Sequence, residues 1–132
     1  MENGKGAVAE RLSNGLGFGS TEFHVVRPKS PILGKFLFEV MQLPMFRREA
    51  EAKMTGKVGH KRVPESFLRN YMIPVPPPEI LEAIVKDIVA VEETASALAK
   101  QIVGDNEEKV GEIVRQAVAA KITAILEGHL KG

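Results

Sequence analysis

The stretch EILEAIVKDIVAVEETASALAKQIV, residues Glu79 to Val103, contains neither glycine nor proline. Its apolar residues recur at alternating spacings of three and four, which is the heptad pattern of a helix that packs against another helix. This stripe consists of Leu81, Ile84, Ile88, Val91, Ala95, Leu98 and Ile102. We predict one long helix that pairs through this stripe as in a coiled coil, because burial of such a face supplies most of a helix's stability.

A second helix is predicted after the break at Gly104–Asn106. Gly104 suits the end of the first helix, and Asp105 or Asn106 suits the N-cap of the next, which begins with two glutamates. The apolar spacing extends this second helix from about Glu107 to Glu127. The pattern leaves open whether the two helices fold back on each other or continue outward.

The chain before the proline run is predicted to mix short helices with strands. Helical spacing begins at Ile32 and continues to Met41, and Pro44 suits the first position of a second helix that stops before Gly56. A short helical turn is expected at Pro64–Asn70, followed by an extended segment, because the prolines beyond it are incompatible with a central strand.

Two strands are expected around the glycine-rich segment SNGLGFGS. In TEFHVV, Phe23 and Val25 alternate with Glu22 and His24, which is the period of a half-buried strand. The predicted fold class is therefore α+β: a partial domain with a small β-sheet and short helices over residues 1–78, followed by a helical arm over residues 79–132.

Composition favours a globular protein of the cytoplasm. Of the 132 residues, 44% are hydrophobic and 27% are charged, which is too apolar for a disordered chain. The absence of cysteine excludes disulfides and thiolate metal sites. The three histidines lie far apart without the spacing of metal ligands, and neither a membrane span nor a signal peptide is apparent. We expect no metal and no cofactor.

Charge divides the chain into two halves. Residues 1–78 carry 12 lysines and arginines against 7 acids, whereas residues 79–132 carry 6 against 10. The basic half is suited to phosphates and the acidic half to a protein partner. Within the basic half, MTGKVGHKRVP (Met54 to Pro64) places several bases on a loop with two glycines that let the backbone approach a ligand closely.

The loop has three competing interpretations: a phosphate-binding loop of an enzyme, a loop that contacts nucleic acid, and an ordinary solvated loop. A phosphate-binding loop of the form GxxxxGK[ST] requires glycine at Glu51 and serine or threonine at Val58, so this interpretation fails. GLGFGS at Gly15–Ser20 likewise lacks the third glycine of a dinucleotide-binding turn, and no catalytic constellation is apparent. An ordinary solvated loop and a loop that contacts a nucleic-acid backbone remain about equally supported by composition.

Several segments in order resemble the specificity subunit of type I restriction–modification systems. The resemblance rests on GFGSTEFHVVRP (Gly17–Pro28), LFEVMQLPMFRREAEAKMTG (Leu37–Gly56) and GHKRVPESFLRNYMIPVPPPE (Gly59–Glu79), and it extends over residues 2–103. In that family this order marks the back half of a target recognition domain, followed by the helix that spaces it from the next domain. The front half of such a domain is missing, so the resemblance implies a truncated or partial subunit.

The resemblance implies a non-catalytic subunit that recognises double-stranded DNA and assembles with methyltransferase and restriction subunits. Those partners, not this chain, use S-adenosylmethionine and ATP. The candidate DNA-contacting residues are Lys57, His60, Lys61 and Arg62, with Lys5 second. The alternative function is a helical interaction or dimerisation module, in which the helices of residues 79–127 self-associate or dock on a partner and DNA reading is lost.

Overall fold

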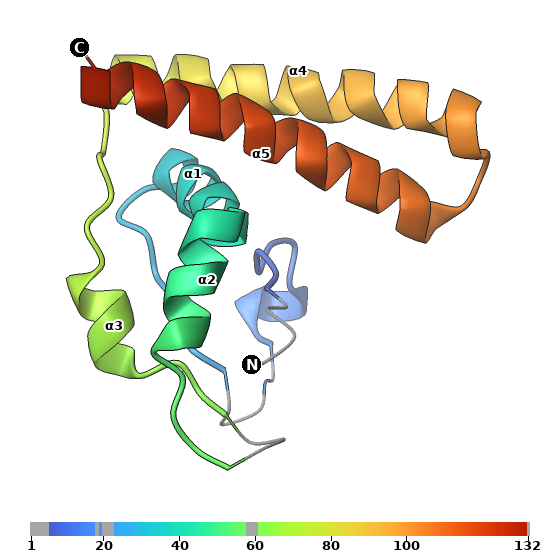
Figure 1. Cartoon of the computed structure of the whole chain (residues 1–132). Helices are drawn as coiled ribbons and strands as arrows, with labels where there is room; N and C mark the ends of the chain where they lie inside the picture. Colours follow the sequence, from blue (N-terminus) through green and yellow to red (C-terminus); the bar gives the residue numbers. More distant parts are fainter. Residues whose placement is uncertain (1–5, 18, 20–22, 58–60, 132) are drawn as a thin grey trace. The chain divides into compact units, whose positions relative to one another are not determined.

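The computed structural model describes residues 6–17, 19, 23–57 and 61–131, with side chains in the last helix described up to residue 128. It divides into two compact units, Met1–Ile73 and Pro74–Gly132. The helical elements of the first unit are η1 (Ser13–Gly15), α1 (Pro31–Gln42), α2 (Pro44–Ala52) and α3 (Glu65–Asn70) (Figure 1). The second unit consists of α4 (Pro78–Val103) and α5 (Glu107–Lys131).

Prolines and a serine cap set the limits of the first helices. The Ser30 hydroxyl accepts a hydrogen bond from the Leu33 amide at 3.3 Å, and Pro31 occupies the first turn of α1, where its missing N–H costs nothing. Leu43 separates α1 from α2 with a ψ of 139°. This extended conformation is the one that a following proline imposes, so Pro44 ends one helix and starts the next.

The apolar faces of α1 and α2 supply much of the buried surface of the first unit. Phe36, Val40 and Leu43 are almost completely buried, and so are Phe46 and Ala50. The buried acid in this unit is Glu39, which has a side-chain oxygen 3.2 Å from the Lys35 ammonium one turn earlier. An oppositely charged partner at this spacing offsets part of the free-energy cost of removing the carboxylate from water.

The predicted small sheet is not found, and the α+β fold class is therefore wrong for the part of the chain that the structure describes. Residues 23–28 belong to no helix and no strand, and the Phe23 and Val25 side chains are 65% and 76% exposed. The β-pairing found among the described residues is one isolated antiparallel bridge between Thr55 and Arg62. The alternation around His24 indicated a local preference, but a strand also needs a paired neighbour and a covered face.

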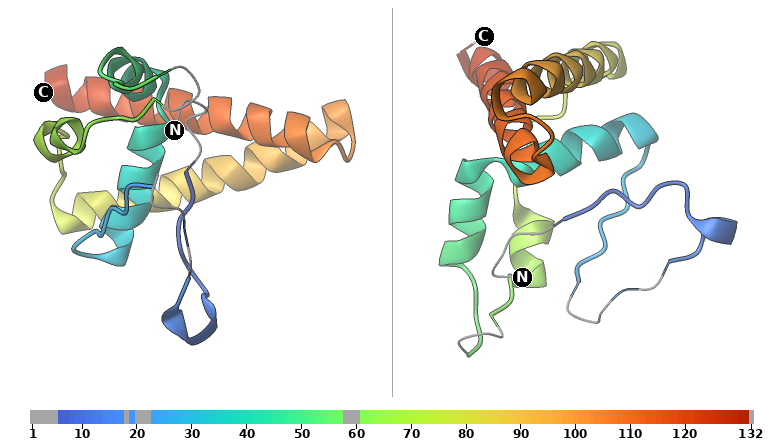
Figure 2. Two further views of the ribbon diagram at one scale, coloured as in Figure 1. Left: turned by 90° about the horizontal axis from the view of Figure 1, so that it is seen from below. Right: turned by 90° about the vertical axis from the view of Figure 1, so that its right-hand side faces the viewer.

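The second unit is a helical hairpin. Both ribbon views show α4 and α5 running side by side in opposite directions, so the second helix folds back on the first (Figures 1 and 2). Gly104 ends α4 with a φ of 70°, a conformation that glycine adopts readily. The Asn106 side chain then accepts a hydrogen bond from the Lys109 amide at 3.2 Å, as expected for the N-cap of α5.

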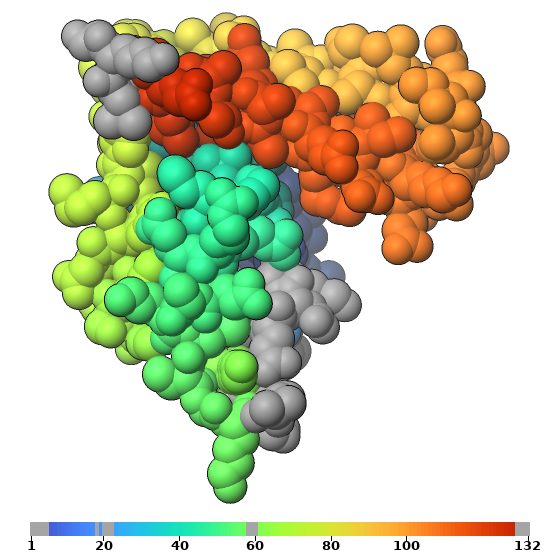
Figure 3. Space-filling model, in the orientation of Figure 1, coloured from blue at the N-terminus to red at the C-terminus, as the bar shows by residue number. Residues whose placement is uncertain are grey.

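Apolar side chains bury one face of each helix of the hairpin, and the side chains of the two helices meet along its length in the space-filling view (Figure 3). An ion pair between Asp87 and Lys121, at 3.9 Å, links the helices at the surface. In the described part of the chain, no helix combines the length and the apolar character needed to cross a membrane. The buried residues are Leu81, Ile84, Ile88, Ala95 and Ala99 of α4, with Val110, Val118 and Ile122 of α5.

Replacement of Ile88 tests this core. Ile88 is 0% exposed, so Ile88→Ala is expected to lower the free energy of unfolding by about 2–5 kcal/mol through lost burial and the cavity left behind. Ile102→Ala on the same helix is the matched control, since Ile102 is 76% exposed and its loss should change stability by no more than about 0.5 kcal/mol. Urea unfolding followed by circular dichroism measures both, and equal effects would contradict the described hairpin.

Candidate nucleic-acid interface

The basic loop, residues 56–62, is closed at its base by backbone hydrogen bonds. Thr55 and Arg62 exchange two of them, with N–O distances of 3.0 and 2.8 Å, as two residues do in a hydrogen-bonded antiparallel pair. Gly56 follows Thr55 with a φ of 119°, a backbone conformation that residues with a Cβ rarely adopt. Thr55 and Arg62, seven residues apart in sequence, are therefore held together at the base of the loop.

Three of the predicted DNA-contacting residues lie on this loop with exposed side chains: Lys57, Lys61 and Arg62. Lys53, at the end of α2, is a further exposed base close to it in sequence. The loop contains no acidic residue, so its net charge is positive. His60 and Lys5 were also predicted to contact DNA and lie outside the described residues.

An aromatic cluster joins the two helices from which the loop projects. The ring of Phe46 on α2 lies 5.8 Å from Phe67 on α3 and 4.9 Å from Tyr71 just beyond α3, and the last two rings are 5.3 Å apart. The Phe46 and Tyr71 rings meet edge to face at 82°. Such pairs stabilise a structure by about 0.5–1.5 kcal/mol each beyond the burial of their area, so the cluster fixes α2 against α3.

His24 attaches the amino-terminal segment to the end of the basic loop. Its Nε2 lies 2.7 Å from the carbonyl oxygen of Val63, and because a carbonyl only accepts, this nitrogen donates. Val63 is itself buried and immediately follows Arg62. Two segments that carry the family resemblance, far apart in sequence, are thereby joined. The sequence assigned His24 to a strand and gave no indication of this contact.

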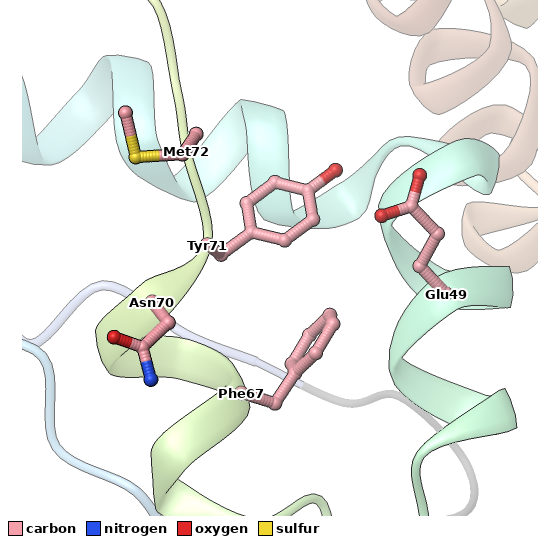
Figure 4. Close-up of a pocket in the computed structure, with 5 residues that line it drawn as sticks. All are labelled: Glu49, Phe67, Asn70, Tyr71 and Met72. Carbon is pink, nitrogen blue, oxygen red and sulfur yellow. The ribbon is translucent and has the colours of Figure 1, made fainter.

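Tyr71 has a neighbour that sequence reasoning missed. Burial of the phenol raises its pKa above the usual 10.0, and the charge of Glu49, together with a hydrogen bond to that carboxylate, raises the pKa further. Figure 4 shows the Tyr71 hydroxyl directed toward Glu49. The sequence signal for this contact was the helical spacing of Phe46 and Glu49 and that of Phe67 and Tyr71. These residues form one site only because α2 packs against α3 and the residue after it.

The residues predicted to pair the long helix fall into two groups. Leu81, Ile84, Ile88 and Ala95 are buried, and Val91 is half-buried. Leu98 and Ile102, at the end of the same stripe, are 54% and 76% exposed, whereas Ala99 beside them is fully buried. No group of three histidine, cysteine or acidic side chains suited to a metal ion occurs among the described residues.

The chain is similar in sequence to the specificity subunits of type I restriction enzymes, and the resemblance deduced from its motifs is confirmed. One relative is the EcoAI specificity subunit of Escherichia coli, which is 45% identical over 86 residues, or 64% of this chain. Another is the EcoEI specificity subunit of the same organism, 43% identical over 78 residues, or 58% of this chain.

The chain spans 15% and 13% of the lengths of these two relatives, so the match is to a small part of each. No protein-family model matches the chain. No solved structure matches it either.

Substitution of Gly56 tests the closure of the loop. Gly56→Ala adds a Cβ where φ is 119°, and strain on the order of 1 kcal/mol should speed hydrogen exchange of the Thr55 and Arg62 amides about five-fold. Gly128→Ala is the control, since a Cβ there meets open space, and it should leave both amides unchanged. Unaltered exchange in Gly56→Ala would contradict the described turn.

The ionisation of Tyr71 is directly measurable because the chain has one tyrosine and no tryptophan. Its ultraviolet titration should give a pKa above 10.0, and Glu49→Gln should lower that pKa by removing the adjacent charge. Because the folded state raises this pKa, the stabilisation is present below pH 10.0 and is lost as the pH rises through the folded value. A pKa unchanged by Glu49→Gln, with exposed Glu51→Gln as control, would rule out the contact.

Proposed function

We propose that the chain is a DNA-contacting part of a type I specificity subunit and that its basic loop binds the phosphate backbone of a duplex. The observation that carries this proposal is the placement of exposed Lys57, Lys61 and Arg62 on a loop whose base is closed by the Thr55–Arg62 bridge. The two relatives described above, both specificity subunits, support it.

The physical basis is the release of counterions. Each lysine or arginine that neutralises a phosphate frees cations condensed on the duplex, so binding weakens steeply as salt rises. A loop closed at its base presents these charges at a lower entropic cost than a segment with free ends. Lys61 or Arg62 is also suited to donate to the O6 and N7 acceptors of guanine in the major groove, where bidentate contacts give sequence discrimination.

On this proposal the chain performs no catalysis. The methyltransferase and restriction subunits of the same cytoplasmic system carry the chemistry, and this chain supplies DNA contact and a docking surface for them. The helical hairpin of α4 and α5 then serves as the spacer and docking arm, in line with the acidic balance of residues 79–132, where 10 acids stand against 6 bases.

The double variant Lys61→Ala with Arg62→Ala tests the loop. Duplex binding should weaken, and the slope of log K against log salt should become shallower by about 1.8, since each phosphate contact contributes about 0.9. Fluorescence anisotropy with a random-sequence duplex between about 50 and about 200 mM salt measures both quantities. The backbone bridge of Arg62 is retained in this variant, so the loop keeps its closure.

The matched control is Lys109→Ala with Arg115→Ala, which removes the same charge from exposed positions of α5. This control should bind duplex DNA as the wild type does. Wild-type protein without salt-dependent duplex binding, or equal losses in the two double variants, would refute the assignment of DNA contact to the loop.

The exposed end of the α4 stripe favours a second candidate function, an interaction module. Leu98 and Ile102 are large apolar residues at 54% and 76% exposure, and they continue the line of residues that is buried nearer the start of the helix. A further helix that covered them would bury area worth about 25 cal/mol per Å². We propose self-association or docking of a partner subunit through this end of α4.

Leu98→Ser with Ile102→Ser tests the interaction module. Because both side chains are largely exposed, the variant should keep the free energy of unfolding measured at high dilution within about 1 kcal/mol of wild type. Sedimentation velocity over a concentration series should show association for wild type and its loss in the variant. Wild-type protein that remains monomeric throughout excludes self-association and leaves partner docking as the form of this function.

A further inference from the structure

A hollow on the first unit combines an acid with aromatic rings and is separate from the basic loop. It has a volume of about 390 Å³ and is lined by Glu49 of α2, Phe67 and Asn70 of α3, and Tyr71 and Met72 beyond it. In Figure 4 the Glu49 carboxylate and the Tyr71 hydroxyl approach each other across it, with the Phe67 ring on the adjacent side. We refer to this hollow as the Glu49 notch.

The Glu49 notch contains one acidic side chain, which is exposed to water. Glu49 is exposed, and the Tyr71 hydroxyl is directed toward its carboxylate (Figure 4), which offers about four acceptor positions. Among the described residues, no base forms an ion pair with Glu49. Arg69, the base of α3, is committed instead to Glu65, whose oxygen accepts from its Nε at 2.6 Å.

The walls of the notch add a second attraction for a cation. Aromatic rings present negative faces, and a cation within about 6 Å of a ring centre is attracted to them. Phe67 and Tyr71 are both half-buried, so each is held in place by the Phe46 contacts while part of its surface remains accessible. Met72 is 89% exposed and provides an adaptable apolar rim.

We propose that the Glu49 notch binds the guanidinium group of an arginine side chain from a protein partner. A guanidinium is planar and weakly hydrated, so it can stack on a ring while its N–H groups donate to a carboxylate, which the compact, strongly hydrated lysine ammonium does less well. A phosphate is repelled by Glu49, and a single carboxylate is too few for a divalent cation. The inference does not rest on DNA binding by the loop.

Intrinsic fluorescence tests the notch without any label. The chain has one tyrosine and no tryptophan, so its emission reports on Tyr71 alone. Titration with N-acetylarginine methylamide should change that emission saturably, with a dissociation constant on the order of millimolar, as expected for one exposed side chain. The citrulline analogue, which has the same shape without the charge, should bind at least about five-fold more weakly, because it loses the ion pair with Glu49.

Two variants on α2 distinguish binding at the Glu49 notch from nonspecific attraction to negative charge. Glu49→Gln should weaken arginine binding by at least about five-fold, since the carboxylate becomes neutral while its size is kept. Glu51→Gln, at an exposed position of α2 that does not line the notch, should bind as wild type does. Equal binding by Glu49→Gln and wild type, or equal binding of the citrulline and arginine probes, overturns the proposal.

The source of the arginine is distinguished by a third probe. The peptide Gly-Gly-Arg-Gly-Gly, blocked at both ends, should bind at least as tightly as N-acetylarginine methylamide if the notch takes arginine from a polypeptide. Binding of N-acetylarginine methylamide without binding of the blocked peptide assigns the notch to a small molecule and overturns the protein partner. A saturable response to a guanosine nucleotide in place of either arginine probe overturns the guanidinium assignment.

Discussion

Phe46 connects the two helices between which the basic loop projects. Its ring contacts Phe67 and Tyr71, at 5.8 and 4.9 Å, and both of these follow the loop in sequence while Phe46 precedes it. Several like charges on the loop repel one another, and the backbone bridge at its base supplies only two hydrogen bonds. Burial of Phe46, which is 7% exposed, offsets this repulsion and keeps the ends of the loop together.

The second unit shows what a heptad pattern does in a nearly straight helix. An ideal helix rotates a strict seven-residue repeat by about 20° per heptad, so three heptads from Leu81 to Ile102 accumulate about 60°. The exposed fractions follow this drift, with Leu81 and Ile88 at 5% and 0% and Ile102 at 76%. Ala99 takes over the buried position, and the end of the stripe turns away from α5.

Sequence patterns predicted the helices well because their signals are local. Proline at the first position, apolar spacing of three and four, and Gly104 with Asn106 gave the helices at α1, α2, α4 and α5 with limits close to those observed. The β-sheet prediction was wrong because alternation over a few residues records a preference, whereas a strand forms only beside a partner. Glu49 and Tyr71 could not be joined from sequence, since their contact depends on how α2 packs against the segment after α3.

The acids of the first unit explain how one small domain carries surfaces of opposite sign. Glu65 is paired with Arg69 one turn away on α3, and Glu39 lies beside Lys35 in the same way on α1. In each pair the acid is neutralised by a base on its own helix, and the residues of the loop itself include no acid. Glu49 faces the Tyr71 hydroxyl (Figure 4), and among the described residues no base forms an ion pair with it. The two proposals therefore assign a phosphate and a guanidinium to different parts of the unit, so that the two ligands need not compete for one site.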